Sequence, residues 1–270
     1  MRRGGTGGVA HLPMYDWPEI RAETDALWNA MREAIRDRGI EAPEALDRSG
    51  QTRRLWAAPE LVLGQTCGLP FVRTLRGRVG LVGTPTYALE GVGPGEYCSV
   101  IVVAEGQTAE GPGDLAGARP AVNSRDSQSG YAALMHWGAP AAQAGRLYGP
   151  PVLTGSHRAS VQALAQGRAE VAAIDAVSWE LARRHEPAAA ALRVLARTDP
   201  APGLPLITGR RGREATLAAA VEEAIAALPD ASRAALLVTG LARRRGPDYD
   251  VIRDRLAAAE ARHVLPGTGD

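Results

Sequence analysis

The sequence predicts an α/β fold of two lobes, each a mostly parallel sheet flanked by helices. Short apolar, β-branched runs alternate with stretches of helical periodicity, as in βαβ units. Two passages, near residues 84–99 and 196–204, interrupt this alternation and indicate chain crossings that act as a hinge. We therefore expect one lobe from residues 1–96 and 200–270, with a second lobe, residues 97–199, inserted between its two parts.

The first lobe is expected to begin with a strand at Val9–Tyr15. In the sequence Asp16-Trp-Pro-Glu19, Asp16 is placed to cap the following helix and Glu19 to complete a capping box. Apolar residues at helical spacing from Ile20 to Ile35 predict that helix, and Gly39 ends it. Two further short, buried strands are expected at Leu61–Gly64 and Val79–Gly83.

The second lobe repeats the alternation of strand and helix. The expected strands are Tyr97–Ala104, 118–122, 147–153, Val171–Asp175 and Leu192–Ala196, and the expected helices lie near 130–138, 156–166 and 176–185. After the second crossing, helical spacing returns at Leu217, Val221, Ala224, Ile225 and Leu228, and further helices are expected to about residue 262.

Two of the predicted strand-to-helix turns carry clustered hydroxyl groups. The first is Asn123-Ser-Arg-Asp-Ser-Gln-Ser-Gly130, and the second is Thr154-Gly-Ser-His157, in which Ser156 is expected to cap the next helix. A helix N-terminus exposes unpaired backbone N–H groups and the positive end of the helix dipole, and Ser127 and Ser129 add hydroxyl donors. Such turns indicate a cleft that binds an anion or a polar ligand head without a lysine.

The composition excludes several classes of function. A net charge of +1 argues against a nucleic-acid or membrane-surface binder, and no apolar run is long enough to span a bilayer. All 31 basic residues are arginine, which excludes lysine-dependent chemistry. Two cysteines form no disulfide framework, and the five histidines are scattered. We expect no cofactor, no metal and a monomer.

The first residues bear on localisation. Residues 1–8 are expected to form a flexible tail, in which Arg2-Arg3 precedes a glycine-rich stretch rather than the apolar core of a secretory signal. We expect a cytoplasmic protein from the sequence as given, and a periplasmic one if a signal has been removed.

Six short segments between about residues 9 and 208 occur in the same order as in a known protein family. They are Leu12-Pro-Met-Tyr-Asp16, Tyr97-Cys-Ser-Val-Ile-Val-Val103, Asp114-Leu-Ala-Gly117, Asp126-Ser-Gln-Ser-Gly-Tyr131, Gly155-Ser-His157 and Gly167-Arg-Ala-Glu-Val-Ala-Ala-Ile-Asp175. Together they resemble the phosphonate/phosphite-type substrate-binding proteins of ABC importers. The resemblance implies the two-lobed type II periplasmic-binding fold, a cleft between lobes that captures a small anionic or polar, phosphonate- or phosphate-like ligand, and an ABC permease as partner.

Carried onto matching positions, the resemblance implies a set of ligand contacts: Tyr15, Gln65, Thr66, Tyr97, Ser127, Gln128, Ser129, Ser156, His157 and Asp175. Two departures bear on the ligand. Gln128 places an amide where the family's Ser-Thr-Ser-Gly motif has a hydroxyl. Arg158 stands where members that bind an aminoalkyl phosphonate carry an acidic residue, and because an arginine repels an ammonium group, it disfavours an aminophosphonate.

The same residues also have purely structural interpretations. Ser127 and Ser129 can serve as ordinary helix caps, and Asp175 can be the N-cap of the helix at 176–185. Tyr15 can be a core tyrosine, and His157 can serve in capping or packing.

An enzyme is the main alternative function. Cys67 in Gln65-Thr-Cys-Gly68, with His157 and Asp175, suggests a nucleophilic triad in a cytoplasmic enzyme on the same fold. A free cysteine is most often a small, buried apolar group, so we expect a non-catalytic binder. A ligand sensor on the same fold is a third possibility.

Overall fold

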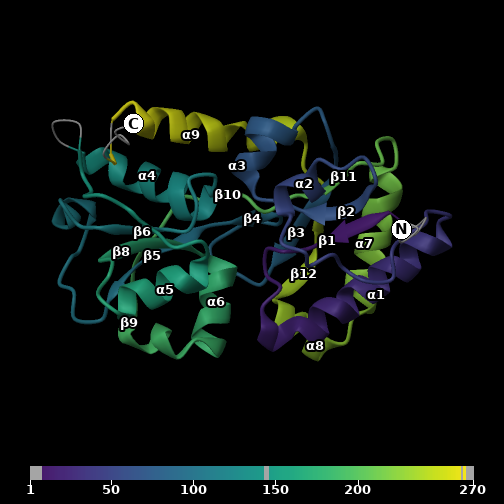
Figure 1. Cartoon of the computed structure of the whole chain (residues 1–270), viewed down its shortest axis with the longest axis horizontal. Coiled ribbons are helices and arrows are strands. Elements are labelled where there is room, and N and C mark those ends of the chain that lie inside the picture. The colour runs from purple at the N-terminus through teal and green to yellow at the C-terminus, as the bar shows by residue number, and fades with distance from the viewer. Residues whose placement is uncertain (1–7, 143–145, 263, 266–270) are drawn as a thin grey trace. The chain divides into compact units, whose positions relative to one another are not determined.

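The computed structural model describes residues 8–142, 146–262 and 264–265 (Figure 1). The chain divides into a first unit, residues 1–96 and 202–249, and a second unit, residues 97–201 and 250–270. Apart from Gly8, the expected flexible tail lies outside the described residues.

The C-terminal segment differs from the expected lobe limits. Residues 250–270, expected in the first lobe, belong to the second unit, because helix α9 (Asp250–Glu260) packs against α4 (Ala133–Gly138) there. The chain therefore passes between the units three times, the third time after Tyr249. At the first two passages the short strands β4 (Glu96–Tyr97) and β10 (Ala201–Pro202) pair with each other.

The first unit is built on a five-stranded sheet of order β1-β2-β11-β3-β12. Its strands are β1 (Val9–His11), β2 (Leu61–Gln65), β3 (Gly80–Tyr87), β11 (Leu206–Thr208) and β12 (Val238–Ala242). Strand β1 is parallel to β2, whereas β11 and β12 run antiparallel to their neighbours. The sheet is therefore mixed rather than mostly parallel. Strand β12 falls where only helices were expected.

Two long helices bury the apolar residues of this unit. Helix α1 (Arg21–Asp37) packs on α7 (Glu214–Ala227), and α7 covers β3 and β12. The helically spaced Trp28 and Ile35 of α1 are fully buried, as their spacing predicts. The remaining helical segments are η1 (Pro18–Ile20), α2 (Thr52–Trp56), α3 (Gly68–Pro70), η2 (Phe71–Leu75), α8 (Asp230–Leu236) and η7 (Gly246–Tyr249).

The expected capping box at Asp16 is wrong. Trp17 occupies the N-cap position of η1, and no side chain caps it. The carboxylate of Asp16 instead accepts hydrogen bonds from Nε and a terminal nitrogen of Arg48, at 2.6 and 3.1 Å. A two-pronged, charge-assisted contact with a guanidinium is stronger than a capping bond.

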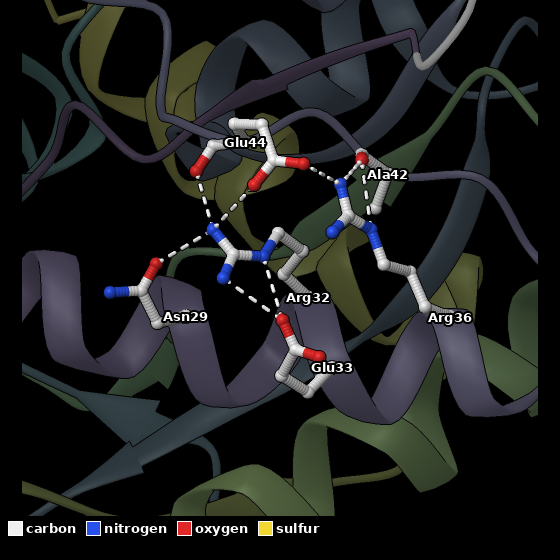
Figure 2. A network of polar contacts seen from close by, with 6 residues as sticks. All are labelled: Asn29, Arg32, Glu33, Arg36, Ala42 and Glu44. Atoms are coloured by element: carbon white, nitrogen blue, oxygen red, sulfur yellow. Dashed lines mark hydrogen bonds and ion pairs between the residues drawn. The ribbon is translucent and has the colours of Figure 1, made fainter.

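The connection that follows α1 is held by two arginines one helical turn apart (Figure 2). A terminal nitrogen of Arg32 donates to the carbonyl of Glu44 at 2.7 Å, and one of Arg36 donates to the carbonyl of Ala42 at 2.6 Å. Both arginines also pair with the Glu44 carboxylate, and the contact with Arg36 lowers the pKa of that carboxyl group. The network lies at the surface, so it orders the connection more than it stabilises the fold.

The second unit has a five-stranded sheet of order β7-β6-β8-β5-β9. Its strands are β5 (Ser99–Ala104), β6 (Pro120–Val122), β7 (Val152–Leu153), β8 (Val171–Asp175) and β9 (Leu192–Arg197). Strand β6 is parallel to β7 and β8, and β5 is antiparallel to β8 and β9, so this sheet is also mixed. The strand expected at 147–153 is reduced to its last residues.

Helices cover both faces of this sheet. Within this unit, α4 and α9 lie on one side, and α5 (His157–Ala165) and α6 (Ala176–His185) lie on the other (Figure 1). A π-helical turn, η4 (Gln128–Ala132), leads directly into α4. The short 3-10 segments are η3 (Pro112–Leu115), η5 (Ala139–Ala141) and η6 (Pro187–Ala191).

Candidate ligand-binding site

The hydroxyl-rich turn after β6 forms the start of η4, as its sequence predicts. Ser127 is the N-cap: its Oγ accepts a hydrogen bond from the backbone N–H of Gly130 at 2.9 Å. The carbonyl of Ser127 accepts hydrogen bonds from the backbone N–H groups of Tyr131 and Ala132, at 3.2 and 3.0 Å. The bond from Ala132 spans five residues, so the first turn is π-helical. The structural role suggested for this serine is therefore present.

Ser129 has different contacts. Its Oγ lies 2.8 Å from Nε2 of His157 and 3.4 Å from Oγ of Ser127. Its carbonyl accepts a hydrogen bond from Oγ of Ser99 on β5, at 2.9 Å. We call Ser127, Ser129 and His157 the hydroxyl set. The second unit thus brings together the N-cap and one residue of η4 with the first residue of α5, all three expected in the site. It adds Ser99, which the sequence reasoning missed.

Gly130 allows the side chains around this set to approach closely. A Cβ atom at Gly130 would overlap Oδ1 of Asn123 and would lie 3.3 Å from Cε1 of His157. Oδ1 of Asn123 and Nδ1 of His157 are buried atoms with no hydrogen-bond partner within the described structure. Buried polar atoms normally have partners, so two unpartnered atoms this close together are unusual. Asn123 was missed as a site residue, although it follows the predicted strand directly and opens the hydroxyl-rich turn.

The hydroxyl set carries no charge at neutral pH. Burial lowers the pKa of His157 to about 4, so its imidazole is neutral, with one ring nitrogen as donor and the other as acceptor. Hydroxyl groups, an imidazole and the N–H groups of a helix start can donate several hydrogen bonds to a small oxyanion.

Two other expected contacts are helix caps. Oγ of Ser156 accepts from the N–H of Ala159 at 3.1 Å, which confirms it as the cap of α5. Oδ1 of Asp175 accepts from the N–H groups of Val177 and Ser178, at 2.9 and 3.0 Å, at the start of α6. Ser156 is exposed and Asp175 is buried. Asp175 on β8 is paired with Ser99 on the neighbouring strand β5. Ser99 is the residue whose hydroxyl donates to the carbonyl of Ser129.

Tyr97 and Gln128 are the remaining expected contacts of the second unit. Both are buried, Tyr97 in β4 and Gln128 as the first residue of η4.

The charge of Arg158 is compensated within the second unit. Its Nε lies 2.8 Å from Oε2 of Glu186, and a terminal nitrogen donates to the carbonyl of His185 at 3.2 Å. Gln162 donates to the same Glu186 oxygen at 2.9 Å, and the hydrogen bond from Arg158 lowers the pKa of Glu186. The sequence argument that Arg158 repels an ammonium group therefore loses force, because a paired guanidinium has little field beyond its partner.

In the first unit, the expected site residues Tyr15 and Gln65 both contact Tyr87. The rings of Tyr15 and Tyr87 pack edge to face with centroids 5.1 Å apart, and Nε2 of Gln65 donates to the hydroxyl of Tyr87 at 3.0 Å. Thr66 is fully buried, and its hydroxyl donates to the carbonyl of Cys67 at 3.4 Å. Tyr87 was missed because it lies in the Gly/Pro-rich passage that the sequence assigns to a crossing.

Neither a metal centre nor a membrane span is found in the described part of the chain. Its His, Cys, Asp and Glu residues include no group of three or more that could hold a metal ion. None of its helices combines the length and the apolar character needed to cross a membrane.

Two α/β units with mixed sheets, the second inserted into the first, form the two-lobed fold of the periplasmic-binding proteins. Residues 10–245 match the family described as the phosphonate periplasmic substrate-binding protein of ABC transporters. The chain belongs to this family, which confirms the resemblance seen in the sequence. The family consists of transporter substrate-binding proteins rather than enzymes, so the triad suggested around Cys67 is set aside.

Solved structures show the same fold over nearly the whole chain. A binding-protein component of an ABC phosphonate transporter from Pseudomonas aeruginosa has a TM-score of 0.70 at 14% identity, covering 96% of this chain and 90% of that one. PhnD1 from Prochlorococcus marinus, in complex with methylphosphonate, has a TM-score of 0.68 at 13% identity, with coverages of 95% and 98%. A Xanthomonas citri protein bound to ATP has a TM-score of 0.67 at 17% identity, with coverages of 96% and 100%. No curated protein sequence matches the chain.

Proposed function

We propose that this protein captures a small phosphonate- or phosphate-like oxyanion in the periplasm and delivers it to an ABC permease. The observation that carries the proposal is the hydroxyl set of the second unit, in which Ser129 and His157 are in contact beside the capped start of η4. Membership of the phosphonate-binding family supports the class of ligand and the transport partner.

The chemistry of the hydroxyl set suits a tetrahedral oxyanion. Three phosphonyl oxygens can each accept more than one hydrogen bond, and the set offers hydroxyl and imidazole donors next to backbone N–H groups. In the proposal, Ser129 and His157 bind the oxyanion directly. Ser127 shapes the turn as a cap and contributes its remaining hydrogen.

The other expected ligand contacts remain proposals, and they fall into two groups. Asp175 and Ser156 already cap helices, so we assign them a positioning role first and a ligand role second. Gln128 and Tyr97 in the second unit, and Tyr15, Gln65 and Thr66 in the first, are retained as proposed ligand contacts.

Isothermal titration calorimetry with one panel of anions tests the proposal. The panel is phosphate, phosphite, methylphosphonate, 2-aminoethylphosphonate, methanesulfonate and malate. We expect at least one phosphorus oxyanion to bind at least 100-fold more tightly than the sulfonate and the carboxylate. Failure of every phosphorus oxyanion to bind, or tighter binding of malate, would reject the proposed ligand class.

A further inference from the structure

Ser99, which is not among the expected ligand contacts, ties η4 to the sheet of the second unit. It is the first residue of β5 and is fully buried. Its hydroxyl donates a hydrogen bond to the carbonyl of Ser129 at 2.9 Å. Its backbone N–H donates to Oγ1 of Thr198, and its carbonyl accepts from the N–H of Thr198, both at 2.9 Å. Ser99 is therefore bonded to η4 through its side chain and to the segment after β9 through its backbone.

Strand β5 gives Ser99 a firm support. The strand has a neighbour on each side, because Ser99 pairs with Asp175 of β8 and Val100 pairs with Arg197 of β9. Strands inside a sheet are among the last parts of a domain to open, and groups placed on them are held more precisely than groups on loops. The hydroxyl of Ser99 is thus presented from a rigid element.

The segment that Ser99 holds is a π-helical turn. The N–H of Ala132 donates to the carbonyl of Ser127, and the N–H of Ala133 donates to the carbonyl of Gln128. Turns with hydrogen bonds over five residues are rare and occur mostly as single turns. Because so short a segment has few hydrogen bonds of its own, one more bond from the sheet contributes strongly to its geometry.

Ser129 is held at two of its atoms. Its carbonyl accepts the bond from Ser99, and its Oγ lies 2.8 Å from Nε2 of His157. The direction of a side chain follows from the backbone that carries it, and a hydrogen bond weakens steeply as its geometry departs from the optimum. A change in the backbone of Ser129 would therefore disturb its contact with His157.

We propose that Ser99 is a positioning residue of the oxyanion site. It fixes the backbone of Ser129, and through it the contact between the Ser129 hydroxyl and His157, without touching the ligand. The inference rests on the proposed function, in which Ser129 and His157 bind the oxyanion. It adds a residue that acts on the ligand through another side chain.

Calorimetry with methylphosphonate, together with thermal unfolding, provides the first test. Ser99→Ala removes the bond to η4, and we expect at least a fivefold loss of affinity. Thr198→Val is the matched control, because it removes a different hydrogen bond of Ser99 and leaves the bond to Ser129 in place. Both variants should lose roughly 2–4 °C of melting temperature, whereas Thr198→Val should keep its affinity within twofold. Equal losses of affinity in the two variants would overturn the inference.

A conservative variant tests whether the hydroxyl itself is responsible. Ser99→Thr keeps the donor on a β-branched side chain that suits a strand, so it should bind methylphosphonate within twofold of the unmodified protein. Ser99→Cys keeps the shape of the side chain but is a weak donor, and it replaces the alanine variant, with the same expected loss, if that variant does not fold. A threonine variant that binds as weakly as the alanine variant would contradict the proposal.

The ring of His157 gives a readout that a purely structural role of Ser99 would not move. Long-range proton–nitrogen NMR spectra of the protein without ligand report the state of each ring nitrogen. We expect Ser99→Ala and Ser129→Ala to shift the Nε2 signal of His157 in the same direction, and Thr198→Val to leave it in place. An unmoved signal in Ser99→Ala would overturn the inference.

The double variant shows whether Ser99 acts through Ser129. If it does, Ser99→Ala combined with Ser129→Ala should bind methylphosphonate within threefold of Ser129→Ala alone, because residues that act as one unit do not give additive losses. Additive losses would overturn the inference and leave the proposed function standing. Failure of the unmodified protein to bind any phosphorus oxyanion would reject the proposed function itself.

Discussion

The imidazole of His157 contacts the hydroxyl of Ser129, Nε2 to Oγ at 2.8 Å, across 28 positions of sequence. Ser129 lies in the first turn of η4, and His157 is the first residue of α5. The contact therefore joins the starts of two helices that follow β6 and β7, which are adjacent and parallel. Because the carboxyl ends of parallel strands lie at one edge of a sheet, turns that follow them meet there. The hydroxyl set is a direct consequence of this topology.

The two serines of the set should respond differently to alanine. Ser127→Ala removes an N-cap, which costs about 1 kcal/mol and lowers the melting temperature by roughly 2–4 °C. Ser129→Ala removes no cap, so we expect little change in melting temperature and at least a tenfold loss of oxyanion affinity. Calorimetry and thermal unfolding of both single variants and the double variant measure this. Losses of affinity that merely follow the losses of stability would mean that both hydroxyls serve the fold alone.

The stability of the protein should depend on pH through His157. Its pKa falls from 6.5 to about 4 on folding, so the unfolded chain binds more protons between these values. The stabilisation is fully present above pH 6.5 and is lost as the pH falls towards 4, by on the order of 1–2 kcal/mol after allowance for partial solvent exposure.

Urea unfolding at pH 4.5, 5.5 and 7 checks the prediction. His157→Gln should flatten the slope between pH 6.5 and 4. An unchanged slope in the His157 variant would show that this ring is not the group responsible.

Gly130 should be essential to the shape of the site. In Gly130→Ala, the new methyl group would collide with Oδ1 of Asn123 and press on the ring of His157. We expect a loss of about 1–3 kcal/mol in stability and at least a tenfold loss in oxyanion affinity. Gly113→Ala is the matched control, because nothing lies within 4 Å of its added Cβ. Normal oxyanion binding by the Gly130 variant would contradict this role.

Two substitutions of Asp175 separate its role as the N-cap of α6 from its proposed role as a ligand contact. The isosteric change Asp175→Asn keeps an Oδ1 acceptor for the N–H groups of Val177 and Ser178, whereas Asp175→Ala removes it. We expect the alanine variant to lose about 1–2 kcal/mol of stability and the asparagine variant clearly less. If the asparagine variant keeps its melting temperature and yet changes ligand affinity, the carboxylate acts on the ligand as well as on the cap. Equal destabilisation by both changes would argue against the capping role.

Features that depend on near neighbours could be predicted from the sequence. The turn from Asn123 to Gly130, the caps at Ser156 and Asp175 and the buried face of α1 each follow from residues within a few positions of one another. Capping and helical periodicity are local interactions, so a local pattern is enough to predict them. The order of the six pieces then sufficed to indicate the family.

Features that depend on distant partners could not be predicted and emerge only from the folded chain. Asp16 does not cap a helix because Arg48 takes its carboxylate, and Arg158 is neutralised by Glu186. Residues 250–270 join the second unit because α9 finds its packing partner in α4. The contact of Ser129 with His157 likewise requires two strands to be placed side by side. These features depend on interaction energies between segments that are far apart in the chain. A short stretch of sequence contains only one of the two partners, so a local pattern cannot predict them.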